Sequence, residues 1–523
     1  MWFAGAGQCL NLAKNPTTSR YVPASKACIV SDRSTRNRVL IVLFDGLRPD
    51  LVNSSLTPNL VRLQHRGAML ARQRTVYPSE TRIALTSLVT GTTPNRHGIV
   101  GNEYFDRRSQ TPRHVDTSEA RTIEELDAAS GGHLLGVPSL GEILQANDRT
   151  LSVLASNSAG ATRLLNHKAR KLGQVTLSGH FPQVATSTEM LERVEALLGP
   201  TPAPPPSGTP DLPAQAFLTS AFLDAIWPQI RPDLAILSFG EPDISSHDHG
   251  VGAPRTLEAI GFVDRQFGRV LDWWESEGES EGVHLIAMSD HGHVTVHARA
   301  DLIETLEAAG LRCGPATAPG IDAIVMPGQV GAIYLAEPSD LLIRQVVAAM
   351  IRRPWCGPIF TAGRGEVDGI APGSFARRLV FADHARSADI LFSFRADDGP
   401  DSFGLCGRSW SESWPISVGV HGGLHVKEMS SLGILAGPLI KGGFVSQVPS
   451  SICDLAPTVL GLLGISPPST MTGRTLAEVF SEGAKEMPGM TEAVHETRDG
   501  AYRQRLRRVR VGAAVYLDAS DVL

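Results

Sequence analysis

The sequence lacks the features that mark membrane proteins and nucleic-acid-binding proteins. Its 523 residues contain no run of about 18 apolar residues, so no transmembrane helix is predicted. The net charge of −6 is small for this length and gives no basic excess of the kind that binds a nucleic-acid backbone. We therefore expect neither a membrane nor a nucleic-acid polymer as a partner. The sequence does not predict an oligomeric state.

Cysteine is scarce as well. The six cysteines are scattered and form no C-x-x-C pair: Cys9, Cys28, Cys313, Cys356, Cys406 and Cys453. This usage favours free thiols in a reducing compartment, although a Cys356–Cys406 disulfide stays open. The first 26 residues also lack the order of basic, apolar and small residues that a signal peptide has. We therefore expect a cytoplasmic protein.

The rest of the composition is that of a globular protein, with 42% hydrophobic and 20% charged residues. The length suits one large α/β domain with a sizeable insertion, or two domains. We predict five segments: an irregular leader at 1–36, the first part of an α/β core at 37–294, an inserted α+β cap at 295–415, the second part of the core at 416–480, and a tail at 481–523 with a possible edge strand at 508–518.

Three apolar runs without alternation are each followed by an acidic residue, at 38–46, 233–243 and 283–293. Such runs are typical of strands that are buried on both faces, as in a parallel sheet. Asp45, Asp243 and Asp290 terminate them. Open α/β sheets bind ligands at the carboxyl ends of their strands, so these carboxylates are expected at one functional edge.

Periodicity and turn residues predict the remaining elements. Helices are expected at 57–70, 82–91, 139–147, 256–276, 339–352 and 454–464, and strands at 151–157, 321–328, 330–337, 377–383, 388–394, 417–425 and 431–437. Trp273 and Trp274 are expected to pack in the interior or on the surface rather than to stack on a base. The proline-rich stretch 201–213 is expected to be a loop or linker, with a proline-helix ligand as the alternative.

The stretch Thr75–Asn102 contains a candidate nucleophile. Thr81 precedes the helix predicted at 82–91, where backbone N–H groups and the positive end of the helix dipole face an anion. The alternative is that Thr81 simply caps the helix. Asn102, at the end of the stretch, is a candidate donor to an oxyanion.

Acidic and histidine residues gather at the predicted strand ends. Three carboxylates and three imidazoles are expected on one edge of the sheet: Asp45, Asp243, His247, Asp290, His291 and His421. These are nitrogen and oxygen ligands of zinc and related metals. They make two sets of three, and Thr81 is available to complete one of them. Two metals about 4 Å apart can clamp a phosphate, so the sequence predicts a zinc-dependent hydrolase of phosphate esters.

A threonine hydroxyl is a poor nucleophile unless a base or a metal activates it. The motif around Thr81 offers no obvious base, which favours coordination of its Oγ1 to a metal. Backbone N–H groups at the helix start and the Asn102 amide would then donate to the phosphoryl oxygens, where charge accumulates.

Nine short motifs occur in the order of one known family: VLFDGLRPD (42–50), TPNL (57–60), YPSET (77–81), SLVTG (87–91), P-x-x-HGIVGN (94–102), PD-x-x-x-H (242–247), SDHG (289–292), HGG (421–423) and DLAPT (454–458). On these motifs the chain resembles the nucleotide pyrophosphatase/phosphodiesterase branch of the alkaline phosphatase superfamily. The resemblance implies an alkaline-phosphatase-like fold, with a central, mostly parallel sheet flanked by helices. It also implies a small phosphorylated substrate.

The resemblance further implies a role for each candidate. One of two divalent ions, most simply zinc, would be held by Asp243, His247 and His421, and the other by Asp45, Asp290 and His291 together with Thr81. Thr81 would form a phospho-threonine intermediate, which water then cleaves. Asn102 would contact the phosphoryl oxygen.

The chain departs from the family pattern directly after Thr81. The family often has T-F-P-N where this chain has Thr81-Arg82-Ile83-Ala84, so Arg82 replaces an aromatic that would help to stack a nucleobase. Arg82 is a candidate for binding a phosphate or carboxylate of the substrate, and the alternative is a surface ion pair with a neighbouring acid. The other histidines near the ligands are expected to support them or line the pocket, because the ligand sets are already complete: His249, His293, His297 and His425.

These inferences favour a hydrolase of phosphodiester or pyrophosphate bonds. A phosphonate hydrolase of the phosphonoacetate type, or a phosphomonoesterase, is the alternative within the same superfamily. A catalytically silent relative that binds phosphorylated ligands is the alternative from another class.

Overall fold

The computed structural model describes residues 36–108, 112–316, 318–328, 330–483 and 487–523. The leader predicted at 1–36 lies outside the described residues, except for its last residue.

The central feature is an eight-stranded sheet with the strand order β21-β2-β20-β9-β1-β8-β6-β7. In that order the strands are Phe444–Ser446, Ala68–Leu70, Gly433–Ala436, Val283–Met288, Arg38–Phe44, Leu234–Phe239, Leu151–Ala155 and Val175–Ser178. The five strands from β9 to β7 run parallel, whereas β20 is antiparallel to both of its neighbours. The predicted mostly parallel sheet is therefore confirmed.

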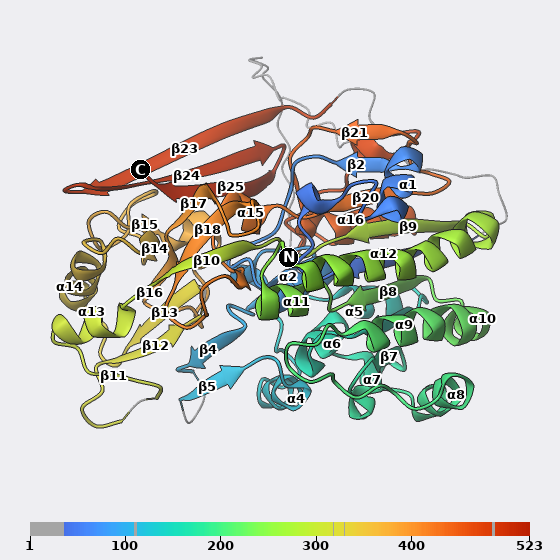
Figure 1. Cartoon of the computed structure of the whole chain (residues 1–523), viewed down its shortest axis with the longest axis horizontal. Coiled ribbons are helices and arrows are strands. Elements are labelled where there is room, and N and C mark those ends of the chain that lie inside the picture. Colours follow the sequence, from blue (N-terminus) through green and yellow to red (C-terminus); the bar gives the residue numbers. More distant parts are fainter. Residues whose placement is uncertain (1–35, 109–111, 317, 329, 484–486) are drawn as a thin grey trace, which may run out of the picture. The chain divides into compact units, whose positions relative to one another are not determined.

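Strand β1 packs against a hydrophobic core on each face, which explains why its sequence shows no alternation. Ile41 belongs to one core, together with helices α2 (Thr81–Thr90) and α16 (Leu455–Leu462). Phe44 belongs to the other core, together with α1 (Pro58–Arg66), α9 (Leu212–Ala221) and α12 (Pro254–Trp273). The ring of Phe44 lies 5.6 Å from that of Phe267 on α12, and Figure 1 shows α12 running alongside β9. Each such buried side chain contributes about 1.5–3 kcal/mol.

The helices expected at 82–91, 139–147, 256–276, 339–352 and 454–464 are present. Two of these are α5 Leu140–Gln145 and α14 Asp340–Met350. The other α-helices of the described residues include α3 Pro94–His97, α4 Ala120–Ala129, α6 Ala159–Leu165, α7 Ala169–Leu172, α8 Thr188–Leu198, α10 Trp227–Ile230, α11 Asp243–His249, α13 Leu302–Ala308 and α15 Val426–Met429. The helix expected at 57–70 ends at Arg66, and β2 follows. At Gly67 a Cβ atom would lie 2.3 Å from the carbonyl oxygen of Leu435, so glycine lets the chain approach β20 here.

Two further sheets contain most of the strands between 294 and 420. One has the order β11-β12-β13-β16-β14-β15, with strands Cys313–Gly314, Ala323–Pro327, Val330–Leu335, Ile390–Phe394, Cys356–Thr361 and Phe375–Ala376. The other has the order β17-β18-β10-β19, with strands Ala396–Pro400, Cys406–Ser411, Val294–Arg299 and Gly419–Val420. The strands expected at 321–328, 330–337 and 388–394 are confirmed. The cap boundaries at 295 and 415 stay a prediction.

The strand expected at 377–383 is wrong. Residues Arg377–Val380 form a 3-10 helix instead. Phe381 ends it with a φ of +56°, in the left-handed region, so the chain cannot stay extended through this segment.

The single edge strand expected at 508–518 is also wrong. That range covers the end of β24 (Tyr502–Val511) and the start of β25 (Ala514–Val522). The chain turns at Gly512, which has a φ of +58° and takes this conformation without a steric penalty. Strand β23 (Met490–Asp499) pairs with β24 along its whole length, so β24 is the central strand of the three-stranded sheet drawn in red in Figure 1.

Two pairs of short strands flank the segment that contains Thr81. Strands β4 (Glu103–Asp106) and β5 (Arg113–Asp116) form a hairpin just after Asn102, and β3 (Gln73–Arg74) pairs with β22 (Ser450–Ser451) just before Thr75.

Several side chains are placed as expected. Trp274 is buried, and its Nε1 donates to the carbonyl of Val283 at 2.8 Å, while the Trp273 ring packs 4.8 Å from that of Trp227. Both tryptophans are thus packing residues. Cys356 and Cys406 are free thiols, so no disulfide joins them. Residues 201–210 form a loop with neither helix nor strand. Among the described helices, none has the length and hydrophobicity needed to cross a bilayer.

We predict that Asp264→Ala lowers the free energy of unfolding by about 2 kcal/mol, because it removes the partner of two N–H groups at the start of α1. Asp264 on α12 is buried and accepts hydrogen bonds from the N–H groups of Asn59 at 3.0 Å and Leu60 at 2.9 Å. Urea denaturation measures the change. Asp272→Ala on the same helix is the control, because its ion pair with Arg62 is exposed and should contribute less than about 1 kcal/mol. Equal losses in the two variants would contradict the prediction.

Candidate active site and metal centre

Three neighbouring strands of the parallel sheet bring their acidic residues to one edge. Asp45 directly follows β1, Asp290 follows β9 after one serine, and Asp243 follows β8 and begins α11. The three side chains are 5%, 1% and 14% exposed, respectively. The predicted gathering of carboxylates at strand ends is therefore present, in a largely buried setting.

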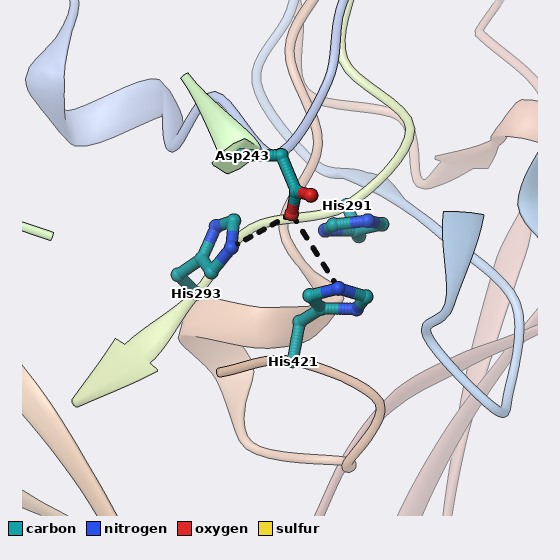
Figure 2. Close-up of side chains that lie close together, drawn as sticks. All are labelled: Asp243, His291, His293 and His421. Atoms are coloured by element: carbon teal, nitrogen blue, oxygen red, sulfur yellow. Dashed lines mark ion pairs between the residues drawn. The ribbon is translucent and has the colours of Figure 1, made fainter. Parts of the chain in front are cut away.

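One group of possible metal ligands surrounds Asp243. Ligand atoms of Asp243, His291, His293 and His421 all lie within 4.8 Å of one another. Figure 2 shows the four side chains gathered together. The Oδ1 atom of Asp243 is 3.0 Å from Nε2 of His293 and 3.4 Å from Nε2 of His421. His247 lies outside this compact group, yet its Nε2 is also 3.4 Å from Asp243 Oδ1.

A second group consists of Asp45, Asp290 and His291. The Nε2 atom of His291 lies 3.4 Å from Asp45 Oδ1 and 3.5 Å from Asp290 Oδ2. The same nitrogen is 3.2 Å from Oγ1 of Thr81. Thr81 thus faces this group, at the position where a hydroxyl would complete a ligand set.

The residues of both groups fit metal ions. Among the described residues, Asp45 Oδ1, Asp243 Oδ1 and Asp290 Oδ2 are buried oxygens without a hydrogen-bond partner. Unpaired buried carboxylate oxygens are costly unless a cation neutralises them. Their imidazole and carboxylate donors are those that bind zinc and related first-row metals.

The pKa values of the group reflect this crowding. Burial, with the charges of Asp290 and Asp243, raises the pKa of Asp45 well above its usual range. Burial also opposes ionisation of Asp243, but the neighbouring His247 and other imidazoles outweigh it and hold the pKa of Asp243 well below its usual range. Burial and the nearby His291 lower the pKa of His421 well below its usual range.

His421 reaches the group from a different sheet than expected. Its strand, β19, has only two residues and pairs antiparallel with β10 in the four-stranded sheet. Its ring is held in place because Nδ1 donates to the carbonyl of Ser79 at 2.9 Å, two residues before Thr81. The prediction that His421 joins the cluster is supported, but its placement on the edge of the main sheet is wrong.

Thr81 is the first residue of α2 rather than its cap. The N-cap position is occupied by Glu80, and no side-chain capping bond is made there. Thr81 is 6% exposed and turned towards His291. The capping alternative for Thr81 is therefore wrong.

Asn102 lies beside the start of α2. Its Oδ1 accepts from the N–H of Arg82 at 3.1 Å, and its own N–H donates to Oε2 of Glu80 at 2.5 Å. Burial raises the pKa of Glu80 to about 7. Because Oδ1 of Asn102 is engaged, its Nδ2 is the end left to donate into the cavity that Asn102 lines.

Arg82 has partners of its own. Its Nε donates to Oγ1 of Thr117 at 3.0 Å, and one of its terminal nitrogens lies 4.0 Å from Asp116. The neighbouring acid of the alternative interpretation is thus present, but Arg82 is only 15% exposed and is not a surface residue. It also lines the cavity next to Thr81, which keeps it a candidate for substrate binding.

A cavity of about 760 Å³ opens over these residues. Residues of the predicted cap region contribute one side of it: Met326, Gly328, Val330, Ser413, Trp414 and Pro415. The Trp414 ring stacks on that of His247, with centroids 4.5 Å apart. A substrate in this cavity would lie between the start of α2 and residues of the cap region.

One residue that contacts the candidate metal ligands was not predicted from the sequence. Asn157 follows β6, and its Nδ2 donates to Oδ2 of Asp45 at 2.6 Å. Its position was a usable signal, because it stands at the end of a predicted strand as the three acids do. His293 was expected only to support the ligands, and it belongs to the first group. The described ligand groups include neither His249, His297 nor His425.

Comparisons with known proteins agree with the fold. The profile of the family described as "Type I phosphodiesterase / nucleotide pyrophosphatase" matches residues 39–392. Human ectonucleotide pyrophosphatase/phosphodiesterase family member 7 is 24% identical over 278 residues, which are 53% of this chain and 52% of the relative. Venom phosphodiesterase CdcPDE from Crotalus durissus collilineatus is 23% identical over 48% of this chain and 26% of its own length. The chain thus spans about half or less of these curated relatives.

Solved structures match a larger share of the chain. Murine ectonucleotide pyrophosphatase/phosphodiesterase 5 gives a TM-score of 0.57 at 18% identity and covers 85% of this chain and 100% of its own. An inactive variant of it, in which a threonine is replaced by alanine, was solved in complex with AMP and gives the same values. The human counterpart gives a TM-score of 0.58 at 17% identity. The fold implied by the sequence resemblance is thereby confirmed.

We predict that a chelator lowers the melting temperature and that added zinc restores it, because a cation relieves the repulsion among the buried carboxylates. Zinc at about 100 times its dissociation constant should add about 2.7 kcal/mol per site. Differential scanning calorimetry of the chelated and zinc-loaded protein measures the shift.

The double variant Asp45→Ala with Asp243→Ala should lose this response. Asp248→Ala, which changes an exposed residue on the same helix as Asp243, should keep it. A melting temperature that does not respond to zinc in the unmodified protein would contradict the prediction.

Proposed function

We propose that this chain, which belongs to the type I phosphodiesterase / nucleotide pyrophosphatase family, is a metal-dependent hydrolase of phosphodiester or pyrophosphate bonds in small phosphorylated molecules. One observation carries the proposal. The hydroxyl of Thr81, at the start of α2, lies 3.2 Å from His291, which belongs to both groups of Asp and His, and the carboxylates of these groups stand at the ends of three parallel strands.

The metal ligands follow from the family resemblance and from these distances. Asp243, His247 and His421 would hold one zinc ion, and Asp45, Asp290 and His291 would hold the other together with Thr81. When bound, the two ions would lower the pKa of the threonine hydroxyl and balance charge on the leaving oxygen. Asn157 would orient Asp45 through its 2.6 Å hydrogen bond.

Thr81 would act as the nucleophile. Its Oγ1 forms a bond to phosphorus as the bond to the leaving oxygen breaks, which gives a phospho-threonine. Water then cleaves that ester and regenerates the hydroxyl. Asn102 would donate from Nδ2 to a phosphoryl oxygen, since its Oδ1 is fixed by the N–H of Arg82. The murine relative whose threonine-to-alanine variant is described as inactive supports this role.

We also propose a substrate class and a cellular location for the protein. The complex of the murine relative with AMP supports a small nucleotide as one substrate class. Arg82 stands where an aromatic is common in the family, which favours a substrate with a second anionic group near the reacting phosphorus.

The free thiols among the described residues support a reducing compartment, and thus the cytoplasm.

We predict that the zinc-loaded protein cleaves bis-p-nitrophenyl phosphate and that Thr81→Ala lowers kcat at least about 10³-fold, because the nucleophile is lost. Release of nitrophenol measures the rate. Thr90→Ala on the same helix is the matched control, because its hydroxyl bonds to the carbonyl of Thr86 and does not face the ligands. An unchanged rate in Thr81→Ala would remove Thr81 from the mechanism.

The same assay separates the alternative functions. A panel of bis-p-nitrophenyl phosphate, p-nitrophenyl phosphate, a dinucleotide and phosphonoacetate should be led by the diesters. Preference for p-nitrophenyl phosphate or phosphonoacetate would favour a monoesterase or a phosphonate hydrolase. Turnover of none of them by metal-loaded protein would contradict the proposal and favour a protein that only binds phosphorylated ligands.

We predict that Arg82→Gln raises KM about 10-fold for a dinucleotide joined through a pyrophosphate, which has two negative charges, and raises it less for bis-p-nitrophenyl phosphate, which has one. Thr117→Val is the control, because it removes the hydroxyl between Arg82 and the carbonyl of Asn102 but keeps the guanidinium. Steady-state kinetics with both substrates measure the effect. Equal changes for both substrates in Arg82→Gln would show that Arg82 acts only by holding Asn102.

A further inference from the structure

Four imidazoles at the metal centre are oriented in the same way. Each turns Nδ1 towards a backbone carbonyl: His247 towards Gly419 at 2.9 Å, His291 towards Gly292 at 3.1 Å, His293 towards Gly46 at 2.9 Å and His421 towards Ser79 at 2.9 Å. A carbonyl oxygen only accepts, so Nδ1 carries the hydrogen in each ring. The remaining nitrogen, Nε2, then faces the carboxylates, as is usual for histidines that bind a metal.

His293 is the ring of this set that the family pattern does not include as a ligand. It lies between β9 and β10 and is fully buried. Its Nε2 is 3.0 Å from Oδ1 of Asp243, which is closer than the 3.4 Å of His247 and of His421. Figure 2 shows the His293 and His421 rings converging on this carboxylate oxygen.

The polar atoms that meet between His293 and Asp243 have no hydrogen-bond partner among the described residues that would compensate for their burial. No other described residue makes a hydrogen bond to His293 Nε2 or to Asp243 Oδ1. Three Nε2 atoms face this one oxygen, from His247, His293 and His421. If all three rings were imidazolium ions, they would repel one another in a buried space, and one carboxylate could not balance them. One divalent cation between the rings and the oxygen satisfies all four atoms at once.

The backbone beside His293 is shaped to admit its ring. Gly46 has a φ of +68°, and a Cβ atom there would lie 2.2 Å from Cε1 of His293. The same glycine supplies the carbonyl that holds Nδ1, and its N–H donates to Oδ1 of Asp290 at 3.0 Å. The turn after β1 thus directs His293 towards the group around Asp243 and holds Asp290 in the group that contains Asp45.

We propose that His293 is a fourth protein ligand of the metal ion held by Asp243, His247 and His421. The site then offers three imidazoles and one carboxylate. A substrate oxygen would be the fifth ligand, so the site suits a first-row metal that accepts five ligands, such as zinc, manganese or iron. This inference rests on the proposed function only for the division of the ligands between two ions.

We predict that His293→Ala and His293→Gln each weaken one of the two zinc sites at least about 100-fold, the upper end of the loss seen when a group that merely supports a ligand is removed. Zinc bound per chain is measured by mass spectrometry over a series of buffered free-zinc concentrations, starting from chelated protein. His297→Ala is the matched control, because this histidine lies four residues after His293, on β10, and its Nε2 is 4.0 Å from Asp397.

Two results would overturn the inference. The first is that both His293 variants fold and bind two zinc ions as tightly as the unmodified protein, which would show that His293 only pairs with Asp243. X-ray absorption of the unmodified protein gives the second test and needs no variant. It should detect four imidazoles shared between two zinc ions, and three would exclude His293.

Neither measurement uses turnover, so the inference and the proposed function can fail separately. A protein that binds two zinc ions through four imidazoles but hydrolyses no ester would contradict the proposed function alone. A protein that hydrolyses diesters with three imidazoles on its zinc ions would contradict the role of His293 alone.

Discussion

The repulsion among three buried carboxylates is the constraint on which the rest of this structure depends. Asp45, Asp243 and Asp290 stand at the ends of three adjacent parallel strands, and burial, together with the charges of Asp290 and Asp243, raises the pKa of Asp45. A fold would not retain such a cluster for packing, because apolar residues of similar size would be more stable there. The cluster is understandable only if cations or imidazoles neutralise it. The imidazoles that surround it are each oriented by a hydrogen bond from Nδ1 to a backbone carbonyl.

This constraint explains why distant segments meet at the strand ends. The parallel strands supply the carboxylates, but they do not supply enough nitrogen ligands. His421 arrives from the four-stranded sheet and is fixed by the carbonyl of Ser79, in the turn that leads into α2. The same turn ends at Thr81. The contact that places an imidazole ligand therefore also places the candidate nucleophile, which couples the four-stranded sheet to the start of α2.

The sequence predicted those parts in which local pattern and tertiary role agree. The apolar runs before Asp45, Asp243 and Asp290 must be strands buried on both faces, and Gly91 ends α2 with a φ of +64°. Features that depend on distant contacts were not predictable in this way. The segment at 377–383 has a strand-like composition, but the conformation at Phe381 prevents an extended chain.

The role of His293 was hidden for a similar reason. The motifs along the sequence already supplied two complete sets of ligands. Nothing in the order of the residues indicated that His293, two positions after His291, would face Asp243. Its placement depends on the space that Gly46 leaves, and Gly46 lies 247 residues away in the chain. The role of Asn157 was easier to predict than that of His293, because Asn157 stands at a strand end, as the three acids do.

The proposed function assigns the reaction and the choice of substrate to different parts of the chain. The candidate ligands and Thr81 lie at strand ends, at helix starts and in short turns, which two buried cores hold in place. The family motifs therefore predict the positions of these residues. The other side of the cavity is formed by residues such as Met326 and Trp414, which lie in the region where the domain boundaries are only predicted. Arg82 stands between the two sides, and Asp116 and Glu80 already offset part of its charge. In the proposed role of Arg82, an anionic group of the substrate would compete with these acids for the guanidinium, so the two acids would reduce the affinity that Arg82 provides.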